Sequence, residues 1–362
     1  MTRIGIVGTG LIGASVGLAL RRDGATVAGH DADPARAEAA RVLGALDEAG
    51  ADVASVARDA DLVVVAVPVG AVAGLVVEAL DAGAAAVTDV GSVKAPIVDE
   101  VEAARPAVAA RFVGGHPMAG SEQDGLDGAD PDLFLGATWV LTPTERTDAT
   151  AFAAVRRLVA GLGAEVIAVT PADHDRLVAM VSHVPQLAAT TLMDVAATGG
   201  GEHATLLRLA AGGFRDMTRI ASGHPGIWPD ICVENRDEIV AALDHYVQAL
   251  TEVRSLVAGR DRDGLLDLLE RARAARRRLP VGAPTGEPLV ELRVPVPDRP
   301  GVLAEVTTLA GSMGINISDI DMAHSVEGGG GVLVLLLPAR DLDAFEQALT
   351  DRGYHHARRL LP

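Results

Sequence analysis

The chain of 362 residues predicts an α/β protein with three parts. Over residues 1–170, short apolar runs alternate with helical patterns, which is the rhythm of a doubly wound parallel sheet. Residues 171–280 contain long helical patterns and almost no strand-like run. A Gly/Pro-rich linker at 281–287 precedes residues 288–362, where strands and helices return in the order βαββαβ of a ferredoxin-like fold.

The first part carries apolar runs of strand length, and 62–67 has the continuous apolar character of a strand buried on both faces of a parallel sheet. The periodicity predicts strands at 3–7, 26–30, 62–67, 85–89, 138–141 and 165–169. It predicts helices at 11–22, 34–43, 69–80, 92–104 and 149–162.

The second part is predicted to be helical, and Pro185 should kink or begin a helix because proline lacks a backbone N–H. Its helices are expected at 173–196, 206–210, 236–258 and 263–278. In the third part we expect strands at 289–294, 315–323, 331–337 and 354–360, with helices at 301–313 and 342–351.

Composition excludes some classes of partner. The formal net charge is −18, whereas nucleic acids and anionic membranes require surfaces rich in Lys and Arg. No apolar run reaches transmembrane length, and the apolar N-terminal stretch lacks a small-residue cleavage site. The single cysteine, Cys232, excludes an internal disulfide framework. We therefore expect a cytoplasmic protein that acts on a small molecule.

A glycine-rich loop, Gly8-Thr9-Gly10-Leu11-Ile12-Gly13, follows the first strand and opens the first helix. These glycines allow a tight turn and bring pyrophosphate close to bare backbone at the helix N-terminus. Asp31 ends the second strand, where an acid binds the ribose 2′-hydroxyl, and it would repel the 2′-phosphate of NADP. The first arginine after it is Arg36, so NAD is the expected cofactor. The alternative for Asp31 is a helix N-cap or turn acid.

A histidine stands in the Gly/Pro-rich stretch Gly114-Gly115-His116-Pro117, which we interpret as a loop after an apolar run. Such loops hold much of the chemistry of α/β proteins, and a positioned histidine suits acid/base work near neutral pH. The more common role of a lone loop histidine is a hydrogen bond to its own backbone. The interpretation of His116 therefore depends on what lies around it.

Two polar segments interrupt the helical part. Ser182-His183-Val184-Pro185-Gln186 places a histidine next to a proline. Asp216 and Arg219 are three residues apart and could share one face of a helical turn, although a surface salt bridge is the more common role for such a pair. Lys94 is the only lysine in the chain, which suggests a role that arginine does not fill.

Six segments together resemble the prephenate/arogenate dehydrogenases of tyrosine biosynthesis. The resemblance implies a Rossmann-type dinucleotide-binding domain, an all-helical dimerisation domain, a homodimer and an active site in the cleft between the two domains. The segments are GTGLIGAS (8–15), DVGSVK (89–94), GGHPMAGSE (114–122), SHVPQ (182–186), GGFRDMTRI (212–220) and WPDI (228–231).

The resemblance implies catalytic roles for two residues. His116 matches the histidine that accepts the proton of the ring hydroxyl while hydride passes to the nicotinamide. Ser92 matches the serine that bonds both this histidine and the substrate hydroxyl. Lys94 could pair with Asp89 or a nearby acid and fix the serine segment.

Binding roles follow from the same resemblance, and no metal site is implied. Arg219 matches the arginine that binds a substrate carboxylate, with Asp216 holding it and His183 lining the substrate side. Gln186 and Glu122 are expected to add polar contacts. The cofactor is expected to contact the glycine loop, Asp31, Val67, Pro68 and Ser92.

The third part resembles an ACT domain, a ferredoxin-like module that often binds amino acids at a subunit interface. The resemblance rests on the turn Pro297-Asp298-Arg299-Pro300-Gly301-Val302-Leu303 together with Asn316. We expect Asp298, Gly301, Val302, Leu303 and Asn316 to bind an effector such as tyrosine. The alternative is a purely structural dimerising module.

The expected function is NAD-dependent oxidative decarboxylation of prephenate to 4-hydroxyphenylpyruvate. Two alternatives remain open, an arogenate dehydrogenase and a catalytically silent amino-acid sensor on the same scaffold. The presence of Ser92, His116 and Arg219 speaks against the sensor.

Overall fold

The fold is described from a computed structural model of the chain. It describes residues 2–119, 125–198, 212–223, 225–276, 289–297, 299–324 and 330–360. The chain divides into two compact units, Met1–Leu250 and Thr251–Pro362. No helix of the described residues is long and apolar enough to cross a membrane.

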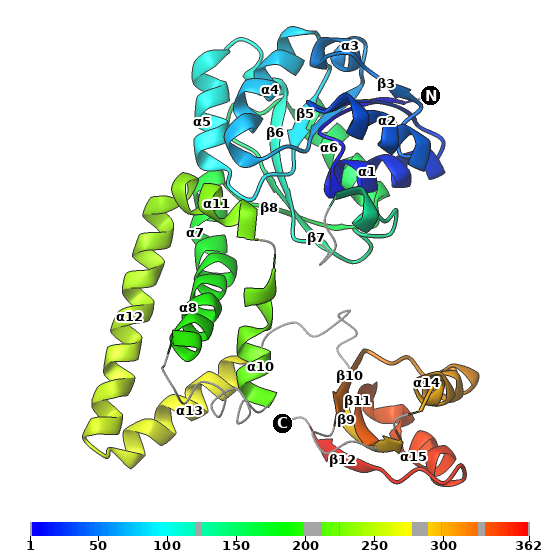
Figure 1. Ribbon diagram of the computed structural model, residues 1–362, viewed down its shortest axis with the longest axis vertical. Helices are drawn as coiled ribbons and strands as arrows, with labels where there is room; N and C mark the ends of the chain where they lie inside the picture. Colours follow the sequence, from blue (N-terminus) through cyan, green and yellow to red (C-terminus); the bar gives the residue numbers. More distant parts are fainter. Residues whose placement is uncertain are drawn as a thin grey trace. The chain divides into compact units, whose positions relative to one another are not determined.

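An eight-stranded sheet in the order β3-β2-β1-β4-β5-β6-β7-β8 forms the centre of the N-terminal part (Figure 1). All neighbouring strands are parallel except β6 and β7, which are antiparallel. The strands are β1 (Arg3–Val7), β2 (Thr26–His30), β3 (Glu48–Ala49), β4 (Leu62–Val65), β5 (Val87–Asp89), β6 (Phe112–Pro117), β7 (Thr138–Thr142) and β8 (Glu165–Ala168).

Helices cover both faces of this sheet because its strands are apolar on both faces. Ile4 and Ile6 of β1 contribute to one core and Val7 to the other. The first core is closed by α1 (Leu11–Arg22), α2 (Pro34–Leu43) and α6 (Ala149–Gly161), and the second by α3 (Val53–Ala57), α4 (Val69–Asp81) and α5 (Ala95–Ala104). Residues Ala109–Arg111 and Gly125–Gly128 form short 3-10 helices.

The structure differs from the predictions for this part in several details, including strands β4 and β5, which are shorter than expected. Residues Gly114 to Pro117, which were interpreted as a loop after an apolar run, belong to strand β6, because they pair with β7. The helix expected from Ser92 begins only at Ala95. Strand β3 and helix α3 were not predicted, because both are too short to show a period.

The single helix predicted over 173–196 is interrupted by a π-helical turn. Pro185 has no N–H to donate to the carbonyl of the preceding turn, so the chain widens before it continues as a helix. The elements of this region are α7 (Pro171–Val178), the π-helix η3 (Ala179–His183), α8 (Val184–Thr198), α10 (Gly212–Thr218), the 3-10 helices η4 (Arg219–Ser222) and η5 (Pro225–Ile227), α11 (Trp228–Glu234) and α12 (Arg236–Ala258).

Helix α12 has the predicted bounds, and the last helix of the region is α13 (Arg262–Arg276). The helix expected at 206–210 and the linker at 281–287 lie outside the described residues.

The C-terminal part has the predicted βαββαβ order. Its antiparallel sheet has the order β10-β11-β9-β12, and alternate residues of β9 pack with both helices into one core. The elements are β9 (Leu289–Pro297), α14 (Val302–Ser312), β10 (Asp319–His324), β11 (Gly330–Pro338), the 3-10 helix η6 (Ala339–Asp341), α15 (Leu342–Thr350) and β12 (Ala357–Leu360). The strand expected at 315–323 starts later, at Asp319.

Candidate active site

The candidate site lies at the carboxyl ends of the parallel strands, where α/β proteins bind their ligands. The glycine loop follows β1 and the Ser92 segment follows β5. His116 stands near the end of β6. Segments that are far apart in the sequence therefore meet at one edge of the sheet.

The glycine loop fits a bound pyrophosphate. Gly8 has φ +92°, and a Cβ there would overlap the carbonyl oxygen of Ala66. A Cβ at Gly13 would overlap the carbonyl oxygen of Gly8, whereas a Cβ at Gly10 meets no atom within 4 Å. Gly10 caps α1 without a side chain, so bare N–H groups face open space at the helix N-terminus.

Asp31 holds this loop in place. Its Oδ2 accepts hydrogen bonds from the backbone N of Thr9 at 2.9 Å and from the Thr9 hydroxyl at 3.1 Å. Its Oδ1 accepts from the backbone N of Asp33 at 3.0 Å and lies 3.6 Å from a guanidinium nitrogen of Arg36. The N-cap of α2 is Asp33, so the helix-cap alternative for Asp31 is wrong. The bond from the backbone N of Asp33 gives Asp31 a role in the turn, and its contact with the ribose stays a prediction.

The other predicted cofactor residues follow strands β4 and β5. The Val67 side chain lies beside Gly8, and Pro68 is exposed and caps α4. Ser92 is half-buried in the segment between β5 and α5. The glycine cradle, the free helix terminus and Asp31 together fit a dinucleotide.

Lys94 pairs with Asp89, as predicted, and both side chains are fully buried. The Lys94 ammonium also donates to the carbonyl oxygen of Gly115 at 2.8 Å. Asp89 in turn accepts from the backbone N atoms of Gly91 and Gly115, at 2.9 and 3.0 Å. This pair therefore ties the Ser92 segment to the residue that precedes His116.

The partner of His116 is His174, which was not predicted. Nδ1 of half-buried His116 lies 2.9 Å from Nε2 of His174, with the two rings edge to face. Nδ1 of His174 lies 2.7 Å from Oδ1 of Asp175. The described contacts include no hydrogen bond between Ser92 and His116, and the role of Ser92 stays a prediction.

Asp175 also connects the helical region to the sheet. Its two carboxylate oxygens accept from the backbone N atoms of Lys94 and Ala95, each at 2.8 Å. This carboxylate, from α7, thereby caps the first turn of α5, which explains why α5 begins at Ala95 rather than at Ser92.

Burial lowers the pKa of His116 well below its ordinary value, and positive charge on His174, Lys94 or His183 lowers it further. His116 is therefore neutral near pH 7 and available as a base. Burial also lowers the pKa of the Lys94 ammonium, an effect that the Asp89 carboxylate opposes.

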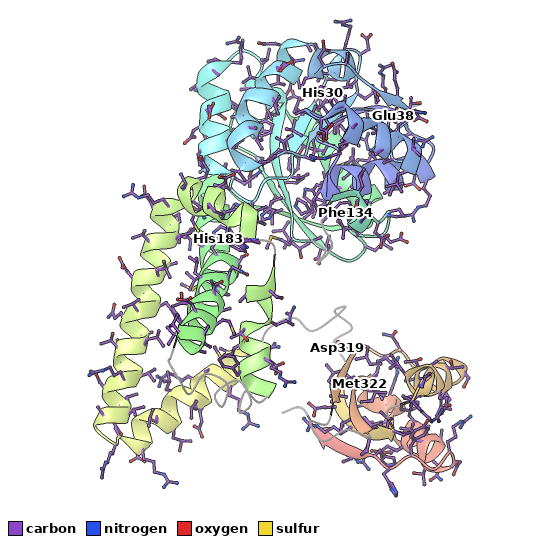
Figure 2. All side chains as sticks on the ribbon, in the orientation of Figure 1. His30, Glu38, Phe134, His183, Asp319 and Met322 are labelled. Carbon is purple, nitrogen blue, oxygen red and sulfur yellow. The ribbon has the colours of Figure 1, made fainter. Side chains whose placement is uncertain are left out.

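His183, labelled in Figure 2, is the last residue of the π-helix η3, which continues as α8. It is 1% exposed and lies edge to face with Trp228. Asn235 Nδ2 donates to His183 Nδ1 at 3.3 Å and to the carbonyl oxygen of Asp175 at 3.0 Å. Burial lowers the pKa of His183 to about 4. Gln186, one turn further, is also buried.

Arg219 and Asp216 are both exposed, and the predicted ion pair between these two described residues is absent. The reason is local, because α10 ends at Thr218 and the chain continues from Arg219 as a 3-10 helix. The 3-10 helix η4 packs against α8, which begins next to His183. Glu122 lies outside the described residues.

Sequence reasoning missed His174, Asp175 and Asn235. A signal was present, because His174 and Asp175 precede the buried Val178 by four and three residues and so share its helix face. Two polar residues on an apolar helix face require partners. Among the described residues, no group of three or more His, Cys, Asp or Glu side chains is arranged to hold a metal ion.

In the C-terminal part, Gly301 lines a cavity of 930 Å³ between α14, the end of β9 and residues 352–355. Arg299 binds Glu305 through both guanidinium Nη atoms at 2.7 Å, and the Tyr354 hydroxyl donates to Glu305 at 2.6 Å. These hydrogen bonds lower the pKa of Glu305 to about 2. Of the other predicted effector residues, Val302 is buried in the core, Leu303 and Asn316 are exposed, and Asp298 lies outside the described residues.

The fold and this site define a dinucleotide-dependent dehydrogenase with a helical second domain. The family model for the prephenate dehydrogenase nucleotide-binding domain matches residues 16–168, and that for the prephenate dehydrogenase dimerization domain matches residues 170–271. The chain therefore belongs to the prephenate dehydrogenase family.

Individual relatives agree with this assignment. The chain is 33% identical to prephenate dehydrogenase from Bacillus subtilis over 93% of its own length and 92% of the relative's. It resembles the crystal structure of A. aeolicus prephenate dehydrogenase in complex with hydroxyphenyl propionate and NAD+ at 31% identity and a TM-score of 0.71, over 77% of this chain and 99% of that one. The crystal structure of Synechocystis arogenate dehydrogenase matches at 33% identity and a TM-score of 0.67, over 75% and 98%.

Proposed function

We propose that the protein is an NAD-dependent prephenate dehydrogenase, which oxidises and decarboxylates prephenate to 4-hydroxyphenylpyruvate in L-tyrosine biosynthesis. One observation carries the proposal. The glycine loop, the Ser92 segment and the neutral base His116 meet at one edge of the sheet. Membership of the prephenate dehydrogenase family adds the substrate class.

In the proposed reaction, His116 accepts the proton of the ring hydroxyl, and Ser92 orients that hydroxyl. Bound NAD+ supplies the hydride acceptor, and loss of CO2 makes the ring aromatic. Arg219 binds a substrate carboxylate, while His183 and Gln186 line the substrate side.

The proposal is tested by following NAD+ reduction with prephenate. We expect turnover with NAD+ and little with NADP+, because Asp31 repels a 2′-phosphate. His116→Asn should lower kcat about 100-fold or more while leaving the Kd for NAD+ unchanged, as expected for loss of a general base. No reduction of either dinucleotide, with prephenate or with arogenate, would overturn the function and favour the amino-acid sensor.

Arogenate is a second candidate substrate, because Synechocystis arogenate dehydrogenase is as similar in sequence as the B. subtilis relative, at 33% identity. Arogenate carries an amine where prephenate has a keto group, and this group lies outside the reacting ring. The ratio of kcat/KM for prephenate and arogenate, measured at one NAD+ concentration, decides between them.

The C-terminal part is proposed to be an ACT domain that binds an amino-acid effector such as tyrosine. Support comes from the βαββαβ fold and from the cavity next to Gly301 and Arg299. Tyrosine should then change turnover in the full-length enzyme. An unchanged rate across a wide range of tyrosine concentrations would contradict effector binding and favour a purely structural role for the C-terminal part.

The proposed assembly is a homodimer formed through the helical region. Helix α12 exposes apolar side chains on one face, namely Val240, Val247, Leu250 and Val257. Exposed apolar stripes of this kind mark protein interfaces. The single cysteine of the chain supports location in the reducing cytoplasm.

A further inference from the structure

We infer that His116, His174 and Asp175 form a proton relay, in which His174 and Asp175 act as positioning residues that fix the tautomer of His116 and take up the proton it removes. The inference rests on the proposed function for its substrate and extends it into the helical region. His116 belongs to strand β6 and the other two residues to helix α7.

The geometry is that of a continuous hydrogen-bonded chain. His116 Nδ1 and His174 Nε2 are 2.9 Å apart, and His174 Nδ1 and Asp175 Oδ1 are 2.7 Å apart. Both α7 residues are almost fully buried, at 1% and 2% exposure. Water therefore competes little for these contacts.

The direction of each hydrogen bond follows from Asp175. Its oxygens already accept the backbone N–H groups of Lys94 and Ala95, so the carboxylate acts as an acceptor. His174 must then carry its proton on Nδ1, and its Nε2 accepts. His116 consequently carries its proton on Nδ1 and leaves Nε2 free as the base.

The relay moves one proton in two balanced transfers. The substrate hydroxyl gives its proton to His116 Nε2, while the hydride of the same carbon leaves for the nicotinamide dinucleotide. The Nδ1 proton of His116 passes to His174 Nε2. His116 is then neutral again, and an imidazolium at His174 is paired with the Asp175 carboxylate. After product release, His174 Nε2 returns its proton to His116 Nδ1, and His116 Nε2 releases its proton to water, which resets the relay.

The charges around His116 favour this transfer. The Lys94 ammonium of the segment before α5 opposes a positive charge on His116, and the Asp89 carboxylate of β5 is already paired with Lys94. His183 of η3, with a pKa of about 4, adds to this opposition only at acid pH. At His174, the adjacent Asp175 stabilises the same charge. The Asp175 carboxylate therefore faces the charge that the transferred proton brings to His174.

Two substitutions of His174 distinguish its two proposed functions, which are to fix the tautomer of His116 and to take up the proton that His116 removes. His174→Gln keeps an acceptor for the Nδ1 proton of His116 but cannot take the proton, whereas His174→Leu removes both functions. We expect kcat to fall about 10-fold in His174→Gln and about 100-fold or more in His174→Leu, with KM and the Kd for NAD+ unchanged. His245→Gln, an exposed histidine on α12, is the matched control and should match the wild type.

The pH profile distinguishes a relay from a structural role. Positive charge on His174 lowers the pKa of His116, so removing His174 should move the acid limb of kcat/KM, which reports His116, to higher pH. A structural role would lower the melting temperature and leave this limb in place. Wild-type kcat with an unmoved acid limb in His174→Gln would overturn the relay.

A measurement without substrate keeps this inference separate from the proposed function. Nitrogen-15 NMR of the imidazole rings in the full-length enzyme at pH 7.5 should show His116 protonated on Nδ1, and His174→Leu should shift it toward the Nε2-protonated form. A wild-type His116 protonated on Nε2 would refute the relay, whatever substrate the enzyme proves to use.

Discussion

Lys94 carries a buried positive charge that is paired directly with the carboxylate of Asp89. The ammonium and Asp89 are both 0% exposed, and together they connect the end of β5 to Gly115 in β6. A buried charge that loses its partner costs far more than an exposed one. The only lysine of the chain therefore holds the backbone next to His116, the proposed base.

We expect Lys94→Met to reduce the free energy of unfolding by about 3–5 kcal/mol, because Asp89 is left as an unpaired buried charge. Arg105→Met is the matched control, since it breaks the exposed pair with Asp81 and should cost about 1 kcal/mol or less. Urea unfolding of the three proteins measures the difference. Equal losses in the two variants would contradict the role of Lys94.

His183 makes stability depend on pH. Its pKa is about 4 in the folded protein and 6.5 in the reference state, so the unfolded chain binds a proton first as pH falls. The stabilisation is complete above pH 6.5 and is lost progressively as the pH falls toward 4. Protonation also conflicts with the hydrogen bond from Asn235 Nδ2, which needs a lone pair on His183 Nδ1.

His183→Gln should therefore reduce the fall of the melting temperature between pH 6.5 and pH 4. The Gln side chain offers an acceptor to Asn235 but has no group that titrates in this range. Thermal unfolding at half-unit pH steps measures the slope, with His245→Gln as the exposed control. Parallel curves for the wild type and His183→Gln would be evidence against this origin of the acid sensitivity.

Strand β6 changes partner along its length, and this positions the site. Its first residues pair in parallel with β5, and its last four pair antiparallel with β7. Two glycines allow the close approach at the change. A Cβ at Gly115 would lie 2.7 Å from the carbonyl oxygen of Asp89 and 2.8 Å from the Thr88 hydroxyl.

Gly115→Ala should accordingly destabilise the protein by about 1–3 kcal/mol and lower kcat, because the backbone next to His116 must shift. Gly74→Ala is the control of opposite sign. Gly74 is exposed inside α4 with no atom within 4 Å of an added Cβ, so alanine should stabilise by about 0.5–1 kcal/mol. Melting temperatures that shift in the same direction would contradict the argument.

At the level of the whole chain, the proposed catalytic residues and the proposed effector domain belong to different units, Met1–Leu250 and Thr251–Pro362. The A. aeolicus structure covers 77% of this chain but 99% of its own, so it lacks a counterpart for about a quarter of the chain. The B. subtilis alignment spans 93% of this chain, which is more than residues 1–288 contain. The alignment therefore extends into the C-terminal part.

A chain truncated after residue 280 should keep kcat and KM for its substrate within about twofold and lose any response to tyrosine that acts through the C-terminal part. Steady-state kinetics of the full and truncated enzymes, with and without tyrosine, measure both properties. A persistent tyrosine response in the truncated enzyme would indicate that tyrosine binds at the active site instead.

The sequence alone determined most elements of the sheet domain and its cofactor loop. The first four elements have the predicted bounds, because buried parallel strands and glycine or proline at helix ends leave local signals. The Lys94–Asp89 pair could also be predicted from the sequence, because only four residues separate the two side chains along the chain.

Only the tertiary structure decided how the proposed base is held. His116 and His174 are 58 residues apart, and Asp175 reaches Lys94 across 81 residues. No local period encodes such pairings, because they depend on how α7 packs against the sheet edge. The extension of β6 through His116 likewise depends on pairing with β7. The residues of a strand do not specify which strand it pairs with, because pairing depends on the packing of the whole sheet.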